Sequence, residues 1–393
     1  ICCSNKQIRI MRQFPFSFLE QPDAAPAGGW PDQSISTWTA TEGNQWLTEG
    51  TSLFNSSNTV SYGTPTYIST TTSNSCCFWA GGTLAPDGNI YVLGHLEDNM
   101  LVINTNTDAI SYIAFPSSIG LNPSAHGGAY SAITNSLYFC TQYGIVFYNL
   151  TTATWSTAYA YPRAGVAQGF ILGPSWDGTK IYYHGFFSVR EIMYFDTTTS
   201  TQVATGATFT GDRIGGGLSH NNKFFMGGGG GSTNLMTYDV ATNTATGITG
   251  GASISADQYR NAVQHPNGYM YSMPGYGATN IKKIDPATLT MTDDASTTSS
   301  GNWNSYRVGG DGKIYCVGAS NLLGIYDTVN QSMATVSISG KYEGMSVGAN
   351  GDIYCIPWST GTDIMKIPVV NGSVITPTNP TPYDGWTGRL QPT

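Results

Sequence analysis

The feature that most constrains this chain is a repeat of about 40 to 50 residues that runs through most of its length. A clear copy begins Asp311-Gly-Lys-Ile-Tyr-Cys-Val-Gly and continues Leu323-Gly-Ile-Tyr-Asp-Thr-Val-Asn. The unit reads as a tight turn, an apolar and aromatic strand, a glycine break, a second strand ending in Asp or Asn, a Thr-rich turn and a third strand. Seven copies are present, anchored on the second position of the first turn: Gly88, Ser136, Gly178, Asn222, Gly268, Gly312 and Gly351.

The spacing of these anchors indicates the architecture. Successive anchors are 48, 42, 44, 46, 44 and 39 residues apart, which is the length of a four-stranded propeller blade and longer than the usual helical-pair or leucine-rich repeat. The composition agrees, because 48 glycines, 24 tyrosines and only 10% charged residues are typical of a protein with many short strands and turns. We therefore predict an all-β fold, a seven-bladed β-propeller of four-stranded blades with a non-repeat N-terminal arm.

Each anchor is followed by apolar or aromatic residues that suit a strand packed between two sheets. Examples are Ile90-Tyr91, Ile314-Tyr315 and Ile353-Tyr354, and we assign these segments to the second strand of each blade. The next strand ends in Asp or Asn, whose side chain can bond the backbone two residues on and close a tight turn. We therefore expect a structural role, not a catalytic one, for Asn104, Asn149, Asp196, Asp239, Asp285 and Asp327.

The extent of the repeat divides the chain into three segments. These are an N-terminal arm or cap at residues 1–75, the ring at residues 76–376 and a Pro- and Thr-rich extension at residues 377–393. We expect the arm to pack on the ring and to serve as an attachment segment, and its strands are candidates to complete a blade. No secretory signal is recognisable, and Met11 is a candidate start. No transmembrane span is recognisable either, so we expect no membrane insertion.

The seven cysteines lack the spacing of a metal site, and we predict no metal and no other cofactor. Cys140, Cys316 and Cys355 fall at equivalent places in second strands, which favours buried side chains. The pairing of the remaining four stays open: Cys2, Cys3, Cys76 and Cys77. Two of the five histidines, His220 and His265, fall in anchor turns, where we expect solvated loop residues.

Positions that break the repeat are the candidates for a binding site, because the fold alone does not specify a function. The residue ten before the anchor, at the start of the innermost strand, is polar in six of the seven copies. In a propeller these strand starts surround one mouth of the central channel, where we place a ligand. With their neighbours in the sequence, the predicted ligand-binding residues are His126, Gln168, Asp212, Arg213, Gln258, Tyr259, Arg260, Asn302, Trp303, Arg307, Lys341, Tyr342 and Glu343.

Aromatic rings and guanidinium groups at this mouth suit sugars, particularly acidic ones. Aromatic faces stack on pyranose rings, and the planar fork of Arg binds carboxylates. A structural interpretation competes with this one, in which blades are joined by the ordinary ion pairs Asp212–Arg213, Asp257–Arg260 and Lys341–Glu343. No catalytic motif is recognisable and we assign no catalytic residue, although His126 beside Arg260 would suit a lyase-like site.

The repeats resemble those of a known superfamily. Asp311-Gly-Lys-Ile-Tyr with Ile325-Tyr-Asp-Thr, and Asn267-Gly-Tyr-Met-Tyr with Ile284-Asp-Pro-Ala-Thr, are similar to the seven-bladed propellers of the YVTN, NHL and Kelch-like kind. The regular Gly-Gly and Tyr–Trp pattern of Kelch repeats and the Gly-His and Trp-Asp dipeptides of WD repeats are missing. Low-charge copies of this kind resemble those of phage and viral structural proteins and of bacterial surface proteins.

Three functional hypotheses stay open, and they make different demands on partners. The first is a non-catalytic propeller on a virion or other extracellular surface, attached to other structural proteins through residues 1–75 and engaging glycans or a protein. The second is an extracellular lyase or hydrolase that acts on polysaccharides at the mouth. The third is a structural protein that assembles into homo-oligomers. A net charge of −8 without a basic tract argues against nucleic acid as a partner.

Overall fold

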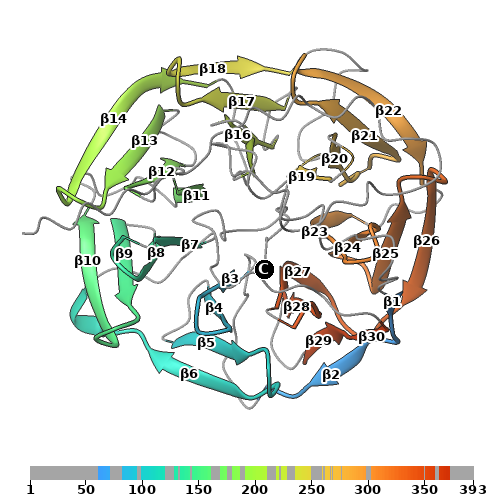
Figure 1. The fold of residues 1–393 in the computed structure, drawn as a ribbon, viewed down its shortest axis with the longest axis horizontal. Coiled ribbons are helices and arrows are strands. Elements are labelled where there is room, and N and C mark those ends of the chain that lie inside the picture. Colours follow the sequence, from blue (N-terminus) through green and yellow to red (C-terminus); the bar gives the residue numbers. More distant parts are fainter. Residues whose placement is uncertain are drawn as a thin grey trace, which may run out of the picture.

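The fold is taken from a computed structural model of the chain. It describes residues 61–70, 82–94, 99–119, 128–131, 133–141, 144–160, 169–174, 179–185, 191–209, 218–220, 223–227, 235–248, 259, 262–265, 267, 269–275, 277–297, 302–348, 350–358 and 363–371. Within these ranges the chain forms seven four-stranded antiparallel sheets, which stand around a common centre like the blades of a propeller (Figure 1). The predicted all-β, seven-bladed architecture is confirmed.

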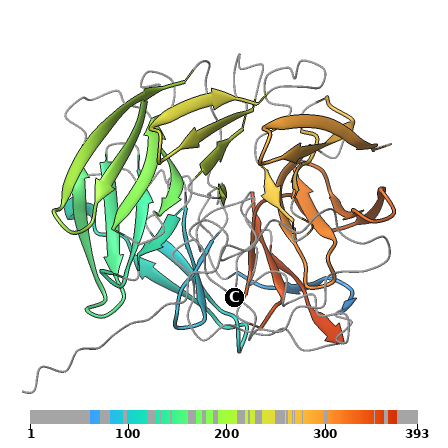
Figure 2. The ribbon, with the colours of Figure 1, turned by 45° about the horizontal axis from the view of Figure 1, so that its top comes forward.

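Each blade runs outward from the centre in chain order, so the first strand is innermost and the fourth is at the rim (Figures 1 and 2). The strands of blades 1 to 3 are β3 (Thr83–Leu84), β4 (Asn89–Leu93), β5 (Asn99–Asn104) and β6 (Ile110–Ala114); β7 (Gly128–Ser131), β8 (Ser136–Cys140), β9 (Gly144–Asn149) and β10 (Thr154–Ala160); β11 (Gly169–Pro174), β12 (Lys180–Gly185), β13 (Glu191–Asp196) and β14 (Thr201–Thr208). A short 3-10 helix, Ser117–Ile119, follows blade 1.

The remaining blades repeat this order. Blades 4 to 6 contain β15 (Leu218–His220), β16 (Lys223–Met226), β17 (Met236–Asp239) and β18 (Thr244–Gly247); β19 (Val263–Gln264), β20 (Met270–Ser272), β21 (Asn280–Asp285) and β22 (Thr290–Ser296); β23 (Trp303–Val308), β24 (Ile314–Gly318), β25 (Leu322–Asp327) and β26 (Ser332–Ser337). Blade 7 has β27 (Tyr342–Val347), β28 (Ile353–Pro357) and β29 (Ile364–Ile367). The segments that follow the anchors are the second strands of their blades, as predicted.

The fourth strand of blade 7 comes from the other end of the chain. It is β2 (Thr66–Ile68), which pairs antiparallel with β29, while β1 (Ser61–Tyr62) pairs with β30 (Val369–Asn371). The blue and red strands therefore lie side by side at the rim in Figure 1. Part of the predicted arm thus completes a blade and closes the ring, whereas its first 60 residues lie outside the described ranges.

The first turn of the repeat explains why an aromatic strand follows each Asx-Gly pair. In blade 6, Asp311 accepts the N–H of Lys313 at 3.1 Å with one carboxylate oxygen and the Tyr315 hydroxyl at 2.9 Å with the other. Gly312 has a φ of 77°, which favours glycine at this position. Asp87 repeats the arrangement in blade 1. The tyrosine therefore fastens the second strand to the turn that precedes it.

The turn between the third and fourth strands is equally regular. In blade 3, Oδ1 of Asp196 accepts the backbone N–H groups of Thr198 and Thr199 at 2.9 and 3.0 Å, and Ser200 then adopts a φ of 55°. This Asx turn was predicted from the sequence and is confirmed. The same pair of backbone hydrogen bonds forms at Asn104, Asn149, Asp239, Asp285 and Asp327.

The hydrophobic core lies between neighbouring blades. Second-strand tyrosines contact the next blade, as where the Tyr182 ring lies 5.1 Å from that of Phe224. Cys140, Cys316 and Cys355 are buried, which confirms the prediction of buried side chains. Burial raises the pKa of the Cys316 thiol, so it stays protonated and apolar in character.

The expectation of a solvated His265 is wrong. The side chain is fully buried between blades 5 and 6, and its Nε2 donates to the carbonyl oxygen of Gly312 at 2.8 Å. The sequence places it in a turn, but the neighbouring blade covers that turn. Burial lowers the pKa of His265 to about 4, so the imidazole is neutral near neutral pH.

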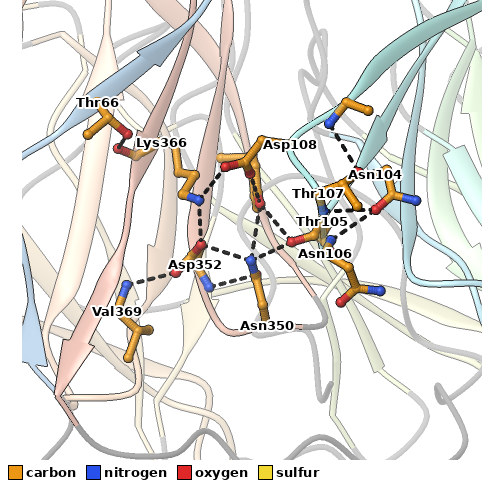
Figure 3. Close-up of polar contacts among 12 residues, drawn as sticks. Thr66, Asn104, Thr105, Asn106, Thr107, Asp108, Asn350, Asp352, Lys366 and Val369 are labelled. Carbon is orange, nitrogen blue, oxygen red and sulfur yellow. Dashed lines mark hydrogen bonds and ion pairs between the residues drawn. The ribbon is translucent and has the colours of Figure 1, made fainter.

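A polar network fastens blade 7 to blade 1 where the ring closes (Figure 3). The Lys366 ammonium on β29 lies 2.7 Å from Asp108 Oδ2 and 3.0 Å from Asp352 Oδ2. Nδ2 of Asn350 donates to the Thr105 carbonyl oxygen at 2.5 Å. Asp108 and Thr105 belong to blade 1 and the other three residues to blade 7, so strand pairing and side-chain contacts close the ring together.

Candidate functional site: the variable face of the ring

The two faces of the ring are built differently. One face, here called the uniform face, carries the turns that join first to second and third to fourth strands, each of two to five residues. These turns are 85–88, 105–109, 132–135, 150–153, 175–179, 197–200, 221–222, 240–243, 265–269, 286–289, 309–313, 328–331 and 348–352. The turns between third and fourth strands all lie within the described residues, and they repeat the same Asx hydrogen bonds.

The opposite strand ends, here called the variable face, carry the remaining connections. Because the strands of each blade are antiparallel, second strands end there, third strands begin there, and each blade leads from there into the next. The connections range from three to fifteen residues: 69–82, 94–98, 115–127, 141–143, 161–168, 186–190, 209–217, 227–235, 248–262, 273–279, 297–302, 319–321, 338–341 and 358–363. Variation in length is thus concentrated on one face.

The starts of the innermost strands belong to the variable face. Asn302 and Lys341 directly precede β23 and β27, as predicted for blades 6 and 7. Lys341 is exposed, and Asn302 has a φ of 45°. Six other predicted site residues lie outside the described ranges: His126, Gln168, Asp212, Arg213, Gln258 and Arg260. Two of the predicted ion pairs, Asp212–Arg213 and Asp257–Arg260, lie outside them as well.

Three predicted aromatic site residues are core residues. Trp303 and Tyr342 are fully buried and Tyr259 is 2% exposed. The Tyr259 hydroxyl donates to the Asn280 carbonyl oxygen at 2.6 Å, and that of Tyr342 to the Ser339 carbonyl oxygen at 2.8 Å. A ligand would reach these rings only after a local rearrangement, and their binding role stays a prediction.

Arg307 is also fully buried, near the inner edge of the ring. Gly309 donates its N–H to the carbonyl oxygen of Lys313, just before the paired strand β24. Backbone groups of successive residues in an antiparallel strand point alternately toward and away from the partner strand. The Tyr306 carbonyl, three residues before Gly309, therefore points away from β24, toward the centre. Arg307 Nη1 donates to this carbonyl oxygen at 3.0 Å. Burial of the neighbouring Cys355 thiol raises its pKa, and the positive charge of Arg307 partly offsets this rise. Arg307 therefore lies deeper than the mouth residues.

Two β-bulges bring Asn304 and Glu343 together. The register of β23 shifts between Trp303 and Ser305, and that of β27 shifts between Tyr342 and Gly344, which leaves Asn304 and Glu343 as the extra residues. Asn304 Nδ2 donates to Glu343 Oε1 at 2.6 Å across the blade boundary, and both residues are mostly buried. Asn304 is not among the predicted site residues, although it stands eight residues before its anchor, as Glu343 does.

The described residues provide neither a metal centre nor a membrane-spanning helix. No group of three or more His, Cys, Asp or Glu side chains in this part of the chain could hold a metal ion. The same residues contain no helix of the length and hydropathy needed to cross a membrane.

Comparison with known proteins gives structural similarity without sequence similarity. No protein-family model matches the chain, and no curated protein matches it in sequence. Among solved structures, virginiamycin B lyase from Staphylococcus aureus aligns over 79% of this chain and 100% of its own, with 12% identity and a TM-score of 0.64.

Two further structures align over the same share of this chain. The WD40 repeats of RRP9 align with 10% identity, 100% coverage of that chain and a TM-score of 0.58. A chain of the Mitotic Checkpoint Complex aligns with 13% identity, 92% coverage of that chain and a TM-score of 0.57. These proteins share a fold with the present chain at identities too low to transfer an activity. The repeat, the seven radial sheets and these similarities together identify the chain as a seven-bladed β-propeller.

Proposed function

We propose that this protein is a non-catalytic binding propeller displayed on a virion or another extracellular surface, and that it engages its partner through the variable face. The observation that carries the proposal is the contrast between the two faces. Turns on the uniform face have two to five residues, and those between third and fourth strands repeat the same Asx hydrogen bonds, whereas connections of the variable face have three to fifteen residues. Binding residues are commonly carried on variable loops that a rigid scaffold holds in place.

The sequence of these connections favours a glycan, particularly an acidic one, as the ligand. Trp79, Arg213 and Arg260 stand in the connections that lead into blades 1, 4 and 5. Aromatic rings stack on sugar faces and guanidinium groups bind carboxylates in pairs of hydrogen bonds. With a net charge of −8 on the whole chain, these cations would give the variable face a local preference for anions.

Surface display is supported by composition and by the way in which the ring closes. The chain is rich in Gly, Ser, Thr, Asn and Tyr and has 10% charged residues, which resembles viral structural and bacterial surface propellers. The strand β2 ties the segment before it directly to blade 7. Residues 1–60 precede this strand in the chain, and in this proposal they attach the ring to a particle.

The test is binding of the purified protein to a panel of neutral and uronate-containing glycans. We expect saturable binding, weakened about tenfold or more by Arg260→Ala, since a charge-assisted hydrogen bond contributes roughly 1.5–3 kcal/mol. Lys313→Ala is the matched control, because it removes a half-exposed cation from the uniform face and should leave affinity unchanged. Equal loss in both variants, or no glycan binding at all, contradicts the glycan proposal.

The same panel separates binding from catalysis. Products released from a bound polysaccharide, in an amount that grows with time and is abolished by His126→Ala, would show an enzyme and overturn the non-catalytic assignment. The structural similarity to virginiamycin B lyase supports the shared fold but does not favour this outcome, since the identity is 12%.

A further inference from the structure

The joint between blades 5 and 6 contains a buried histidine that connects both blades. His265 follows β19 in blade 5, and its Nε2 lies 2.8 Å from the Gly312 carbonyl oxygen and 3.4 Å from the Thr328 hydroxyl, both in blade 6. The ring also meets Tyr271 edge to face, with centroids 5.4 Å apart. The side chain is fully buried.

The partners of His265 specify a neutral imidazole. A carbonyl oxygen only accepts hydrogen bonds, so Nε2 carries the hydrogen in the contact with Gly312. Nδ1 accepts the backbone N–H of Asn267 at 3.3 Å, so it needs a free lone pair. A proton on Nδ1 would set two N–H donors against each other inside the joint. Protonation is therefore incompatible with this set of hydrogen bonds.

Two charged groups act on His265, one from each of two neighbouring elements, and their effects are opposite. Lys283, on β21, lies close enough to disfavour a second positive charge, and its ammonium is itself held over the Tyr269 ring at 4.0 Å. Asp327, at the end of β25, favours the charge, but its Oδ1 already accepts the N–H groups of Val329 and Asn330. Burial is the largest effect, and it favours the neutral ring.

We propose that this joint is an acid-sensitive latch, which holds blades 5 and 6 together at neutral pH and opens locally when His265 takes up a proton. The joint between blades 7 and 1 makes its ion pairs through Lys366, which is a cation at neutral and acidic pH alike. Acid should therefore loosen the joint between blades 5 and 6 before the joint between blades 7 and 1.

The proton favours the open joint because it binds there more tightly. In the closed joint the pKa of His265 is about 4, whereas a solvated histidine in the open joint has its ordinary value of about 6.5. Above about pH 6.5 neither form is protonated and the latch has its full strength. As the pH falls from about 6.5 to about 4, the open form alone gains protons and the latch weakens progressively.

Native-state hydrogen exchange, corrected for the intrinsic exchange rate, tests the proposal on the intact protein. In blade 6 the readout is the amide of Gly309, which donates to Lys313, and in blade 5 that of His265, which donates to Tyr269. Between about pH 7.5 and about pH 5, the two pKa values predict a roughly 25-fold rise in the opening equilibrium constant.

Blade 7 supplies the matched control, because Gly348 donates to Asp352 in the equivalent turn. Its amide should keep its protection over the same pH interval. His265→Gln retains a donor for the Gly312 carbonyl without titrating, and it should abolish the pH effect in blades 5 and 6. Equal loss of protection in blades 6 and 7 of the natural protein overturns the proposal, whether or not the variant folds. A pH effect that persists in folded His265→Gln overturns it as well.

Discussion

Single side chains set the geometry of the tight turns on the uniform face. In each turn between third and fourth strands, one oxygen accepts two backbone N–H groups, as Asp196 does from Thr198 and Thr199. Asn149 makes the same two bonds in blade 2. Because Asp and Asn offer the same Oδ1 acceptor, the turn requires the acceptor and not the charge.

Asp196→Ala should lower the free energy of unfolding by about 1 kcal/mol, since it removes local hydrogen bonds at a half-exposed turn. Asp196→Asn should be nearly neutral at pH 7 because it keeps the acceptor. Urea unfolding of the three proteins measures the difference. An Asn variant as unstable as the Ala variant would show that charge, and not the acceptor, closes the turn.

The pH dependence of the same comparison has a defined sign. Hydrogen bonds from the Thr198 hydroxyl and from the backbone lower the pKa of Asp196. Its contribution as a carboxylate is therefore present above the ordinary carboxyl pKa and is lost as the pH falls through the lowered value. The natural protein should lose its advantage over Asp196→Ala in acid, whereas Asp196→Asn should keep it.

The contrast between Asp196 and His265 shows which residues can be interpreted from sequence. An Asx turn is local, so four or five consecutive residues contain all the information that predicts it. The burial of His265 depends on Gly312 and Thr328, which stand 47 and 63 residues away. A local pattern carries no information about such a neighbour.

Among elements, the innermost strands of blades 6 and 7 depart from regular pairing at their starts. Bulges at the start of β23 and β27 turn Asn304 and Glu343 toward each other between blades 6 and 7. The sequence predicted the strands and their starts, but a bulge adds one residue without altering the apolar pattern that identifies the strand. The positions of Asn302 and Lys341 directly before their strands were therefore predictable, whereas the contact between Asn304 and Glu343 was not.

The bulge in β23 requires a glycine on its partner strand. A Cβ added to Gly318 would collide with the Asn302 carbonyl oxygen, which is backbone and cannot rotate away. Gly318→Ala should therefore lower the free energy of unfolding by about 2 kcal/mol or more, measured by urea unfolding. Gly247→Ala, where nothing lies within 4 Å of the added atom, is the control and should change stability by less than about 0.5 kcal/mol. Equal effects would contradict the bulged geometry.

At the scale of the whole molecule, the repeat predicted the number of blades because it recurs at a period that only a few architectures share. The chain segment that completes blade 7 was only a candidate. Strand β2 is three residues long, has no anchor turn and pairs about 300 residues away, so no local signal assigns it to β29. The boundaries at residues 75 and 377 stay predictions, because the chain around both lies outside the described ranges.

Lys366→Met should weaken the closure between blades 7 and 1. The Lys366 side chain is 15% exposed and its ammonium joins two carboxylates. Hydrogen bonds to Asp108 and Asp352 outweigh the effect of burial and raise the pKa of Lys366. We expect a loss of about 2 kcal/mol in urea unfolding, between the values for exposed and for buried ion pairs.

Lys313→Met provides the comparison for that loss. Its ammonium lies 4.0 Å from Asp311 and its side chain is 43% exposed, so the expected change is below about 1 kcal/mol. Similar losses in the two variants would mean that the network at the closure contributes no more than an ordinary surface pair.

The central claim, that the N-terminal strand closes a ring of seven blades, is tested most directly by hydrogen exchange in residues 61–68 of the intact protein. The structure pairs these residues with β29 and β30, and the Gly63 N–H donates to the Pro368 carbonyl oxygen at 2.8 Å. The predicted result is slow exchange at Gly63, with protection similar to that of the outer strands of the other blades. Exchange at the rate of an unstructured chain would contradict the closed ring.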